Sequence, residues 1–262
     1  MKYSLLFRTD AWVLCLFLFV GCIFMVSLGK LVQIKFFSHD VQESRGGVNS
    51  LLGALFGLWG FMLAFTFSQS SARFDNVRTI MVDESNVIRN TILRVETFPD
   101  SIRTGLRPDM QKYLEAQIDY YKYAADLEKF IKAKQTTEDV KKQLWMKTIA
   151  ASHLPNMGIT SANMLASLTG MYDIASKRDA LLLSDVPELV VYMLFFLALC
   201  ISFIGGFTTP ANIKPKEWLV IVGFLLLASI IIYITFDLAR PLRGFIKPTI
   251  GIDRLAELRK LM

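Results

Sequence analysis

Residues 46–72 read GGVNSLLGALFGLWGFMLAFTFSQSSA and contain no Asp, Glu, Lys or Arg. A helix needs about 20 apolar residues to cross the hydrocarbon core of a bilayer, so this stretch is long enough to span one. The helical character continues beyond it, because no Gly or Pro interrupts residues 61–98. At 1.5 Å per residue this segment would be about 57 Å long, which predicts a helix that leaves the membrane.

Three further stretches also lack charged residues: 11–29, 189–213 and 218–236. Hydrophobic residues make up 53% of the 262 residues, against roughly 45–50% in a soluble domain. Four buried helices of a soluble protein are one alternative, and a cleaved signal peptide at the first stretch is another. Uncharged runs of this length are rare in soluble cores, and the first continues past Cys22, beyond the length of a signal core. We therefore expect an all-α integral membrane protein with four transmembrane helices.

The sequence between the second and third stretches shows helical periodicity and no strand alternation, which predicts a helical domain. We expect four segments in the chain: transmembrane helices 1 and 2 in residues 1–72, a cytoplasmic helical domain in 73–186, transmembrane helices 3 and 4 in 187–239, and a cytoplasmic C-terminal tail in 240–262. Within the helical domain we expect a helix end at Phe98-Pro99, a helix start at Pro108, a polar break at 134–137 with Thr137 as a cap, a break at 153–158, and a last helix over 160–183.

Basic residues flank the same side of all four spans, which by the positive-inside rule places both termini and the helical domain in the cytoplasm. These residues are Lys2, Arg8, Arg73, Arg78, Lys177, Arg178, Arg240, Arg243 and Lys247. The net charge of +6 is modest, and we expect no nucleic-acid partner.

The composition argues against catalysis. All three cysteines, Cys15, Cys22 and Cys200, lie within predicted spans, and the two histidines, His39 and His153, are far apart in the sequence. We therefore expect no metal site and no cofactor. Intramembrane catalysis needs polar groups at depth, and the spans offer only scattered Ser and Thr and one Gln near an end, so we expect no enzymatic site.

The second span is the candidate pore. Gly57, Phe61 and Phe65 are spaced by four and share one stripe of the helix, and Gln69 continues this stripe into a polar end. Several copies of this helix around an axis would stack rings of phenylalanine, and hydrophobic rings can gate ion flow by dewetting. The alternative is that Phe61 and Phe65 pack against neighbouring helices or lipid.

Four charged residues follow this span: Arg73, Arg78, Asp83 and Glu84. The arginines could concentrate anions in a vestibule, and the two acids could form a ring that favours cations. The alternative is that they pair with one another along the helix.

Residues 63–78, LAFTFSQSSARFDNVR, resemble the segment of bestrophin channels in which a Gly/Ala-Phe pair ends the pore constriction. In that family an Arg-aromatic pair follows eight residues after the phenylalanine, as Arg73-Phe74 follows Phe65 here, and a second Arg comes soon after, here Arg78. Residues 83–88 (DESNVI) and 237–244 (DLARPLRG) are similar to the bacterial bestrophin-like membrane proteins.

The resemblance implies an oligomeric ion channel of the bacterial inner membrane, with the lipid bilayer and inorganic ions as partners. By this analogy the channel is a homopentamer with Gly57, Phe61 and Phe65 as its neck. Ion selectivity differs between family members, so the analogy does not fix its sign, and we expect conduction of anions such as chloride. The chain departs from the family at Gly57, where channel members place a bulky apolar residue, and it lacks a recognisable acidic calcium-binding cluster. Two rival functions are a membrane-anchored helical sensor or scaffold and an energy-coupling proton channel. The proton channel is disfavoured because no acid lies within the spans.

Overall fold

A computed structural model describes residues 10–36, 41–183, 188–210 and 214–262. In these ranges the chain is helical and contains no strand, which confirms the expected all-α class. The helices are α2 (Ala11–Phe36), α3 (Val41–Val95), α4 (Asp100–Lys122), α5 (Leu127–Ser152), α6 (Gly158–Leu183), α7 (Glu188–Thr208), α8 (Pro215–Leu238), α9 (Thr249–Glu257) and the 3₁₀ helix η1 (Leu258–Leu261). The expected basic residues Lys2 and Arg8 and the expected boundary at 186/187 lie outside the described residues.

The chain divides into two compact units. The membrane unit comprises residues 1–72 and 185–239, and the helical unit comprises residues 73–184 and 240–262. Helix α3 contributes its first part to the membrane unit and its last part to the helical unit.

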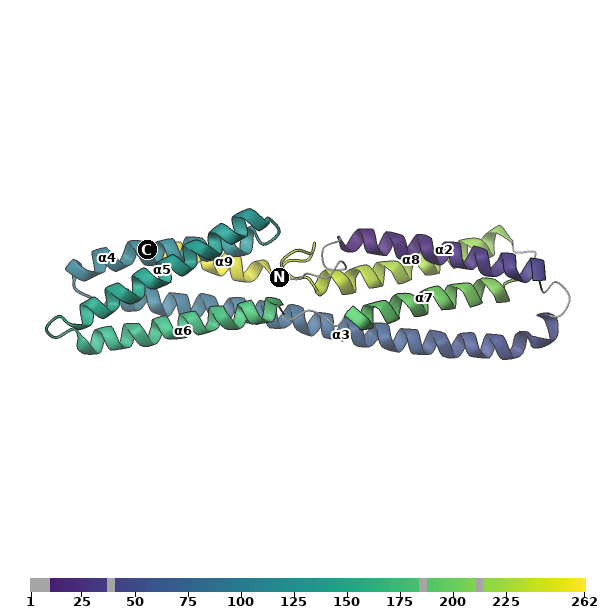
Figure 1. The fold of residues 1–262 in the computed structure, drawn as a ribbon, viewed down its shortest axis with the longest axis horizontal. Coiled ribbons are helices and arrows are strands. Elements are labelled where there is room, and N and C mark those ends of the chain that lie inside the picture. Colours follow the sequence, from purple (N-terminus) through teal and green to yellow (C-terminus); the bar gives the residue numbers. More distant parts are fainter. Residues whose placement is uncertain (1–9, 37–40, 184–187, 211–213) are drawn as a thin grey trace. The chain divides into compact units, whose positions relative to one another are not determined.

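The membrane unit contains α2, α7, α8 and the first part of α3 (Figure 1). These four helices are each long and apolar enough to cross a membrane, as the sequence predicts. Helix α2 packs against both α7 and α8. The core of this unit is apolar and draws on all four helices, with Leu18, Val26, Leu63, Leu194 and Ile232 among its buried members.

Two glycines bring α2 and α7 into backbone contact. A Cβ atom added to Gly29 would lie 2.1 Å from the carbonyl oxygen of Phe203, and one added to Gly206 would lie 2.1 Å from that of Val26. No side chain fits at either distance. Small residues at helix crossings in lipid allow this close approach and the dispersion contacts that come with it.

The helical unit contains the last part of α3 together with α4, α5, α6, α9 and η1 (Figure 1). An apolar stripe along α3 is buried at Val77, Met81, Ile88, Ile92 and Val95. These residues pack with apolar side chains of α4, α5, α6 and α9 in one core. The predicted break at residues 153–158 is confirmed: α5 ends at Ser152, α6 begins at Gly158, and Asn156 adopts a left-handed backbone with φ 61°.

The predicted start of a helix at Pro108 is wrong. Helix α3 ends near Phe98-Pro99 as expected, but α4 begins at Asp100 and carries Pro108 in its interior. The amides of Ile102 and Arg103 both donate to the carbonyl of Pro99 and so close the first turn. Leu106, which precedes the proline, is fully buried in the core of the helical unit. Its packing therefore extends the helix ahead of Pro108.

The predicted polar break at residues 134–137 is also wrong. Helix α5 is continuous, and Asp126 caps its start by accepting a hydrogen bond from the amide of Lys129. Thr137 lies in mid-helix, where its hydroxyl donates to the carbonyl of Ala133 at 2.9 Å. A threonine can satisfy its hydroxyl inside a helix in this way, so local polarity did not mark a helix end.

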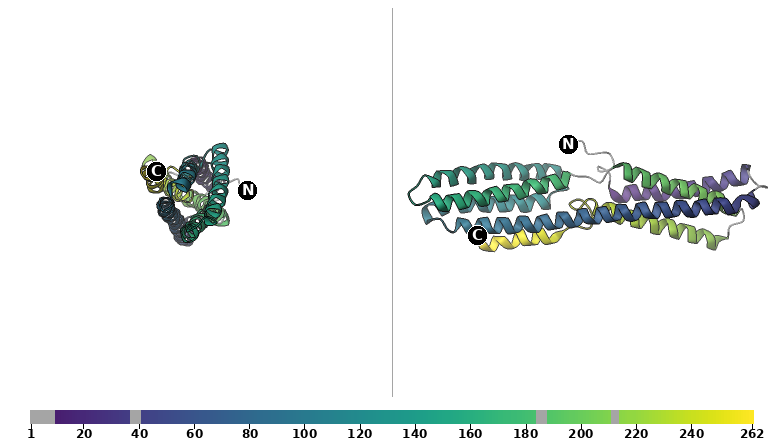
Figure 2. Two further views of the ribbon diagram at one scale, coloured as in Figure 1. Left: turned by 90° about the vertical axis from the view of Figure 1, so that its left-hand side faces the viewer. Right: turned by 90° about the horizontal axis from the view of Figure 1, so that it is seen from below.

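Residues 240–262, expected as a C-terminal tail, fold onto the helical unit. Helix α9 lies beside α3 (Figure 2). A Cβ atom added to Gly251 would lie 2.5 Å from the Cβ of Met81. Leu255 is fully buried. The guanidinium of Arg259 binds both carboxylate oxygens of Glu115 on α4, at 2.7 and 2.5 Å.

Candidate functional site

One face of α3 in the membrane unit is not covered by any described part of the chain. It carries the four residues predicted to line a pore. Phe61 and Phe65 are 71% and 51% exposed, and Gly57 and Gln69 are exposed as well. A Cβ atom added to Gly57 would meet no atom within 4 Å. The predicted stripe thus lies on one continuous outward face of the helix.

The opposite face of α3 is buried and fixes the rotation of the helix. Trp59, Leu63, Thr66 and Ser70 are buried there. The indole nitrogen of Trp59 donates to the carbonyl of Leu194 on α7, at 3.2 Å. Because this bond ties one face of α3 to α7, the phenylalanines on the other face point away from the packed interior of the unit.

The charged residues predicted near the pore mouth lie in different environments. Glu84 is fully buried, whereas Asp83 and Arg78 are exposed. Arg73 is partly buried, and its guanidinium donates to the carbonyl of Leu182 at the end of α6, at 3.4 Å. Within a single protomer, these four side chains therefore do not form one cluster.

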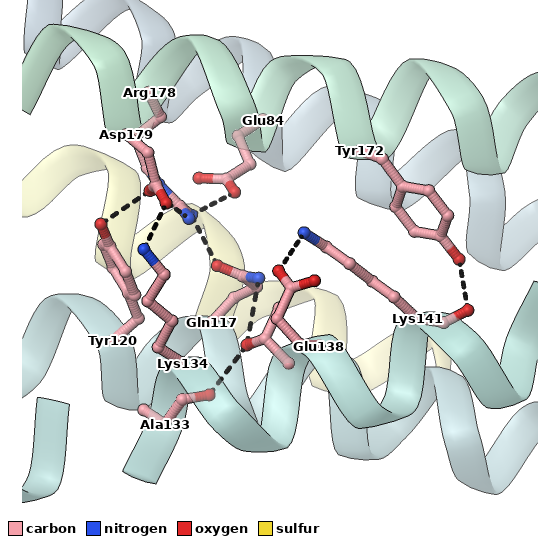
Figure 3. Close-up of polar contacts among 11 residues, drawn as sticks. Glu84, Gln117, Tyr120, Ala133, Lys134, Glu138, Lys141, Tyr172, Arg178 and Asp179 are labelled. Atoms are coloured by element: carbon pink, nitrogen blue, oxygen red, sulfur yellow. Dashed lines mark hydrogen bonds and ion pairs between the residues drawn. The ribbon is translucent and has the colours of Figure 1, made fainter. Parts of the chain in front are cut away.

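Glu84 forms a buried ion pair with Arg178 of α6 (Figure 3). Nη1 of Arg178 lies 2.5 Å from a carboxylate oxygen of Glu84 and donates to the side-chain oxygen of Gln117 at 2.6 Å. The hydroxyl of Tyr121 donates to the second carboxylate oxygen of Glu84. The side chains of Arg178 and Glu84 are only 3% and 0% exposed.

Asp179 extends this cluster towards the surface of the helical unit. It accepts hydrogen bonds from Arg178 and from the hydroxyl of Tyr120, the latter at 2.8 Å, and lies 3.2 Å from the ammonium of Lys134 (Figure 3). The guanidinium of Arg178 also stacks 3.9 Å from the centre of the Tyr120 ring. We define the Glu84 cluster as Glu84, Gln117, Tyr120, Tyr121, Arg178 and Asp179.

The charges in this cluster shift several pKa values. Burial alone would raise the pKa of Asp179, but the Arg178 guanidinium beside it lowers this pKa below its ordinary value. Burial also opposes the charge of Arg178, yet the Glu84 carboxylate raises the pKa of Arg178 well above its ordinary range. Burial, and then the charge of Glu84, raise the pKa of Tyr121. Arg178 therefore stays charged and Tyr121 stays neutral across the physiological pH range.

Sequence reasoning considered pairing for Glu84 but missed its partner. Arg178 was interpreted only as a basic residue that flanks a span. One signal was present in the sequence, because Glu84 falls in the helical register of Val77, Met81 and Ile88. An acid on a buried stripe needs a cationic or hydrogen-bonding partner. The residues near Glu84 in the sequence do not show which residue that partner is.

The Glu84 cluster has the properties of a structural junction between α3, α4 and α6. The guanidinium of Arg178 is surrounded by acceptors from Glu84, Gln117 and Asp179. Among the residues that the structure describes, no group of three or more His, Cys, Asp or Glu could hold a metal ion. The outward face of α3 is therefore the stronger candidate for function.

Comparison with known proteins places most of the chain in one family. The sequence model of the bestrophin-like domain matches residues 20–247. This range includes α3, α7, α8, the Glu84 cluster and α2 from residue 20 onward. No curated protein and no solved structure matches the chain.

Proposed function

Because the chain belongs to the bestrophin-like family, we propose that it forms an oligomeric ion channel in which copies of α3 surround the ion path. The family is channel-like rather than enzymatic. A homopentamer with both termini in the cytoplasm is the assembly that we propose.

The observation that carries this proposal is the outward face of α3. A single chain leaves Phe61 and Phe65 exposed on a membrane-length helix whose other face is anchored through Trp59. Gly57 adds no side chain to the same face. Small residues allow helices of neighbouring copies to approach closely in lipid. Copies of α3 that turn this face towards a common axis would line the ion path with their phenylalanine rings.

Rings of phenylalanine have the chemistry of a gate. An apolar constriction can stop ion flow by losing its water, and the edges of phenylalanine rings carry partial positive charge. Gly57, one turn before Phe61, would leave the path wider or the helices closer at that level. Phe61 and Phe65 would therefore form the narrowest, driest part of the path.

Replacement of the phenylalanines tests this function directly. We expect Phe61→Ala and Phe65→Ala to raise ion flux in proteoliposomes several-fold, because each removes an apolar ring from the constriction. Phe196→Ala on α7 is a matched control, since Phe196 is 66% exposed on another membrane-length helix. Unchanged flux in both neck variants of a well-folded oligomer would exclude the gate and favour the scaffold function.

An anion preference is the finer part of the proposal. Arg78 is exposed on α3 beyond the neck and supports it, whereas Asp83 on the same helix is also exposed and opposes it. Glu84 contributes little to the ion path because Arg178 neutralises its charge inside the helical unit. We expect the reversal potential in a chloride gradient to lie near the equilibrium potential of chloride. The substitution Arg78→Gln should shift the reversal potential towards the equilibrium potential of the cation. A cation-following potential in the unmodified protein would refute the preference without affecting the channel function.

A further inference from the structure

The membrane unit contains a partly open cavity that the proposed ion path does not use. Its volume is about 340 Å³, and side chains from α2, α3, α7 and α8 form its wall. Its lining residues include Phe56, Trp59, Gly205, Val220, Phe224 and Ala228. No lining residue is an Asp, Glu, Lys, Arg or His.

The polar groups in the wall are already occupied within the protein. The three hydroxyls and the indole each donate to a backbone carbonyl, at distances of 2.7 to 3.2 Å: Ser202 to Ala198, Thr209 to Gly205, Ser229 to Leu225, and Trp59 to Leu194. A polar ligand would lose its hydration without gaining a donor in return, which is unfavourable. The cavity therefore selects an apolar occupant.

Side chains of α3 and α8 connect the wall of this cavity to the outer surface of the membrane unit. Phe56, Val220 and Phe224 line the cavity and are also exposed on the outside of the membrane unit. The rings of Phe56 and Phe224 meet edge to face with centroids 5.6 Å apart. The surrounding medium at this depth is the acyl region of the bilayer.

A positive charge lies at the appropriate end of the cavity for a lipid head group. Lys216 is exposed in the first turn of α8, one helical turn before Val220. Lysines at the ends of membrane helices extend their ammonium groups to the head-group level. A lipid phosphate near Lys216 would leave its acyl chain beside the opening of the cavity.

We propose that this cavity is a lipid-binding site that takes one acyl chain of an anionic phospholipid, with its phosphate near Lys216. An apolar cavity of about 150 Å³ in a soluble protein can stay dry and bind a small apolar molecule. The cavity described here is larger, and chain-shaped hydrocarbon surrounds it. The site is independent of ion conduction.

Trp59 reports on the occupant, because it lines the cavity and is only 9% exposed. The full-length protein with Trp12→Phe, Trp145→Phe and Trp218→Phe leaves Trp59 as its single tryptophan. In nanodiscs of phosphatidylglycerol with brominated acyl chains, we expect its fluorescence to be quenched at least twofold relative to unbrominated lipid.

Two cavity-filling variants and one control make this test specific. A Cβ atom added to Gly205 meets nothing within 4 Å, so Gly205→Leu places a side chain in the cavity, and Ala228→Leu fills it from α8. Both should remove most of the quenching. Gly223→Leu on α8 also adds a side chain in open space but does not line the cavity, so it should leave quenching unchanged.

Retention of lipid gives a second readout. Native mass spectrometry of the protein in mild detergent should show a bound phospholipid that Gly205→Leu loses and Gly223→Leu keeps. Lys216→Gln should reduce retention of phosphatidylglycerol more than that of phosphatidylethanolamine. Equal quenching in Gly205→Leu, Gly223→Leu and the parent would overturn the proposal. So would an unquenched Trp59 in the parent, which would indicate that a neighbouring copy fills the cavity.

Discussion

Glu84 and Arg178 form the most buried ion pair of the helical unit. Removing two charges from water is costly, and the pair compensates for this cost only while both partners and their hydrogen bonds are present. Gln117, Tyr121 and Asp179 supply those additional bonds. The pair fixes the relative rotation of α3 and α6 within the unit, since neither charged group could turn towards the core alone.

Glu84→Gln tests the strength of this junction. The substitution keeps the shape of the side chain but leaves the Arg178 guanidinium without its buried counter-charge. We expect the free energy of unfolding of the helical unit to fall by about 3 kcal/mol. Asp83→Asn is the neighbouring control, because its exposed carboxylate should change stability by no more than about 0.5 kcal/mol. Denaturant titration followed by circular dichroism measures both, and equal effects would contradict the structural role of the pair.

At the scale of the element, α3 combines two different helix surfaces. In the membrane unit its buried face carries Trp59 and Leu63, and its outward face carries glycine and phenylalanine. In the helical unit its buried face carries Val77 and Met81. One unbroken helix can serve both units because no Gly or Pro interrupts residues 61–95.

The α2–α7 pair depends on the absence of a side chain at one residue. Gly29→Ala would place a Cβ atom 2.1 Å from the Phe203 carbonyl oxygen, so the helices must separate. We expect a loss of about 1–3 kcal/mol, in line with overpacked cores, and a clear fall in the melting temperature in detergent. Gly223→Ala is the control, since its Cβ meets nothing within 4 Å. If both variants melt at the same temperature, the close crossing of α2 and α7 is absent in the folded protein.

At the scale of the whole molecule, the outward face of α3 requires an assembly. We expect native mass spectrometry in mild detergent to detect a closed pentamer, because a ring of α3 helices needs several copies around one axis. Phe61→Ala should leave the stoichiometry unchanged, since the ring edge lines the path rather than the contact between copies. A monomer or dimer under conditions that retain lipid would remove the axis and contradict the channel function.

The sequence was sufficient to predict the four membrane-length helices, the all-helical class and the long α3, because these depend on local features. The bilayer is the one favourable environment for an uncharged apolar run such as residues 46–72. An uninterrupted repeat of apolar residues at helical spacing favours one backbone conformation, the α-helix. The family could be recognised for the same reason, since its motif at residues 63–78 is a continuous segment.

Long-range packing decided the remaining features, and no local pattern contains that information. Pro108 and Thr137 looked like helix boundaries, but a buried Leu106 and an internal hydrogen bond kept both helices continuous. Arg178 looked like a topological charge, but α6 places it against Glu84, 94 residues away. The sequence does not distinguish Gly29 from the other glycines among its 15, whereas the structure shows that the backbone of α7 packs against it. Each of these features depends on which backbone or charged group from a distant part of the sequence packs against the residue. Only the folded chain brings those partners together.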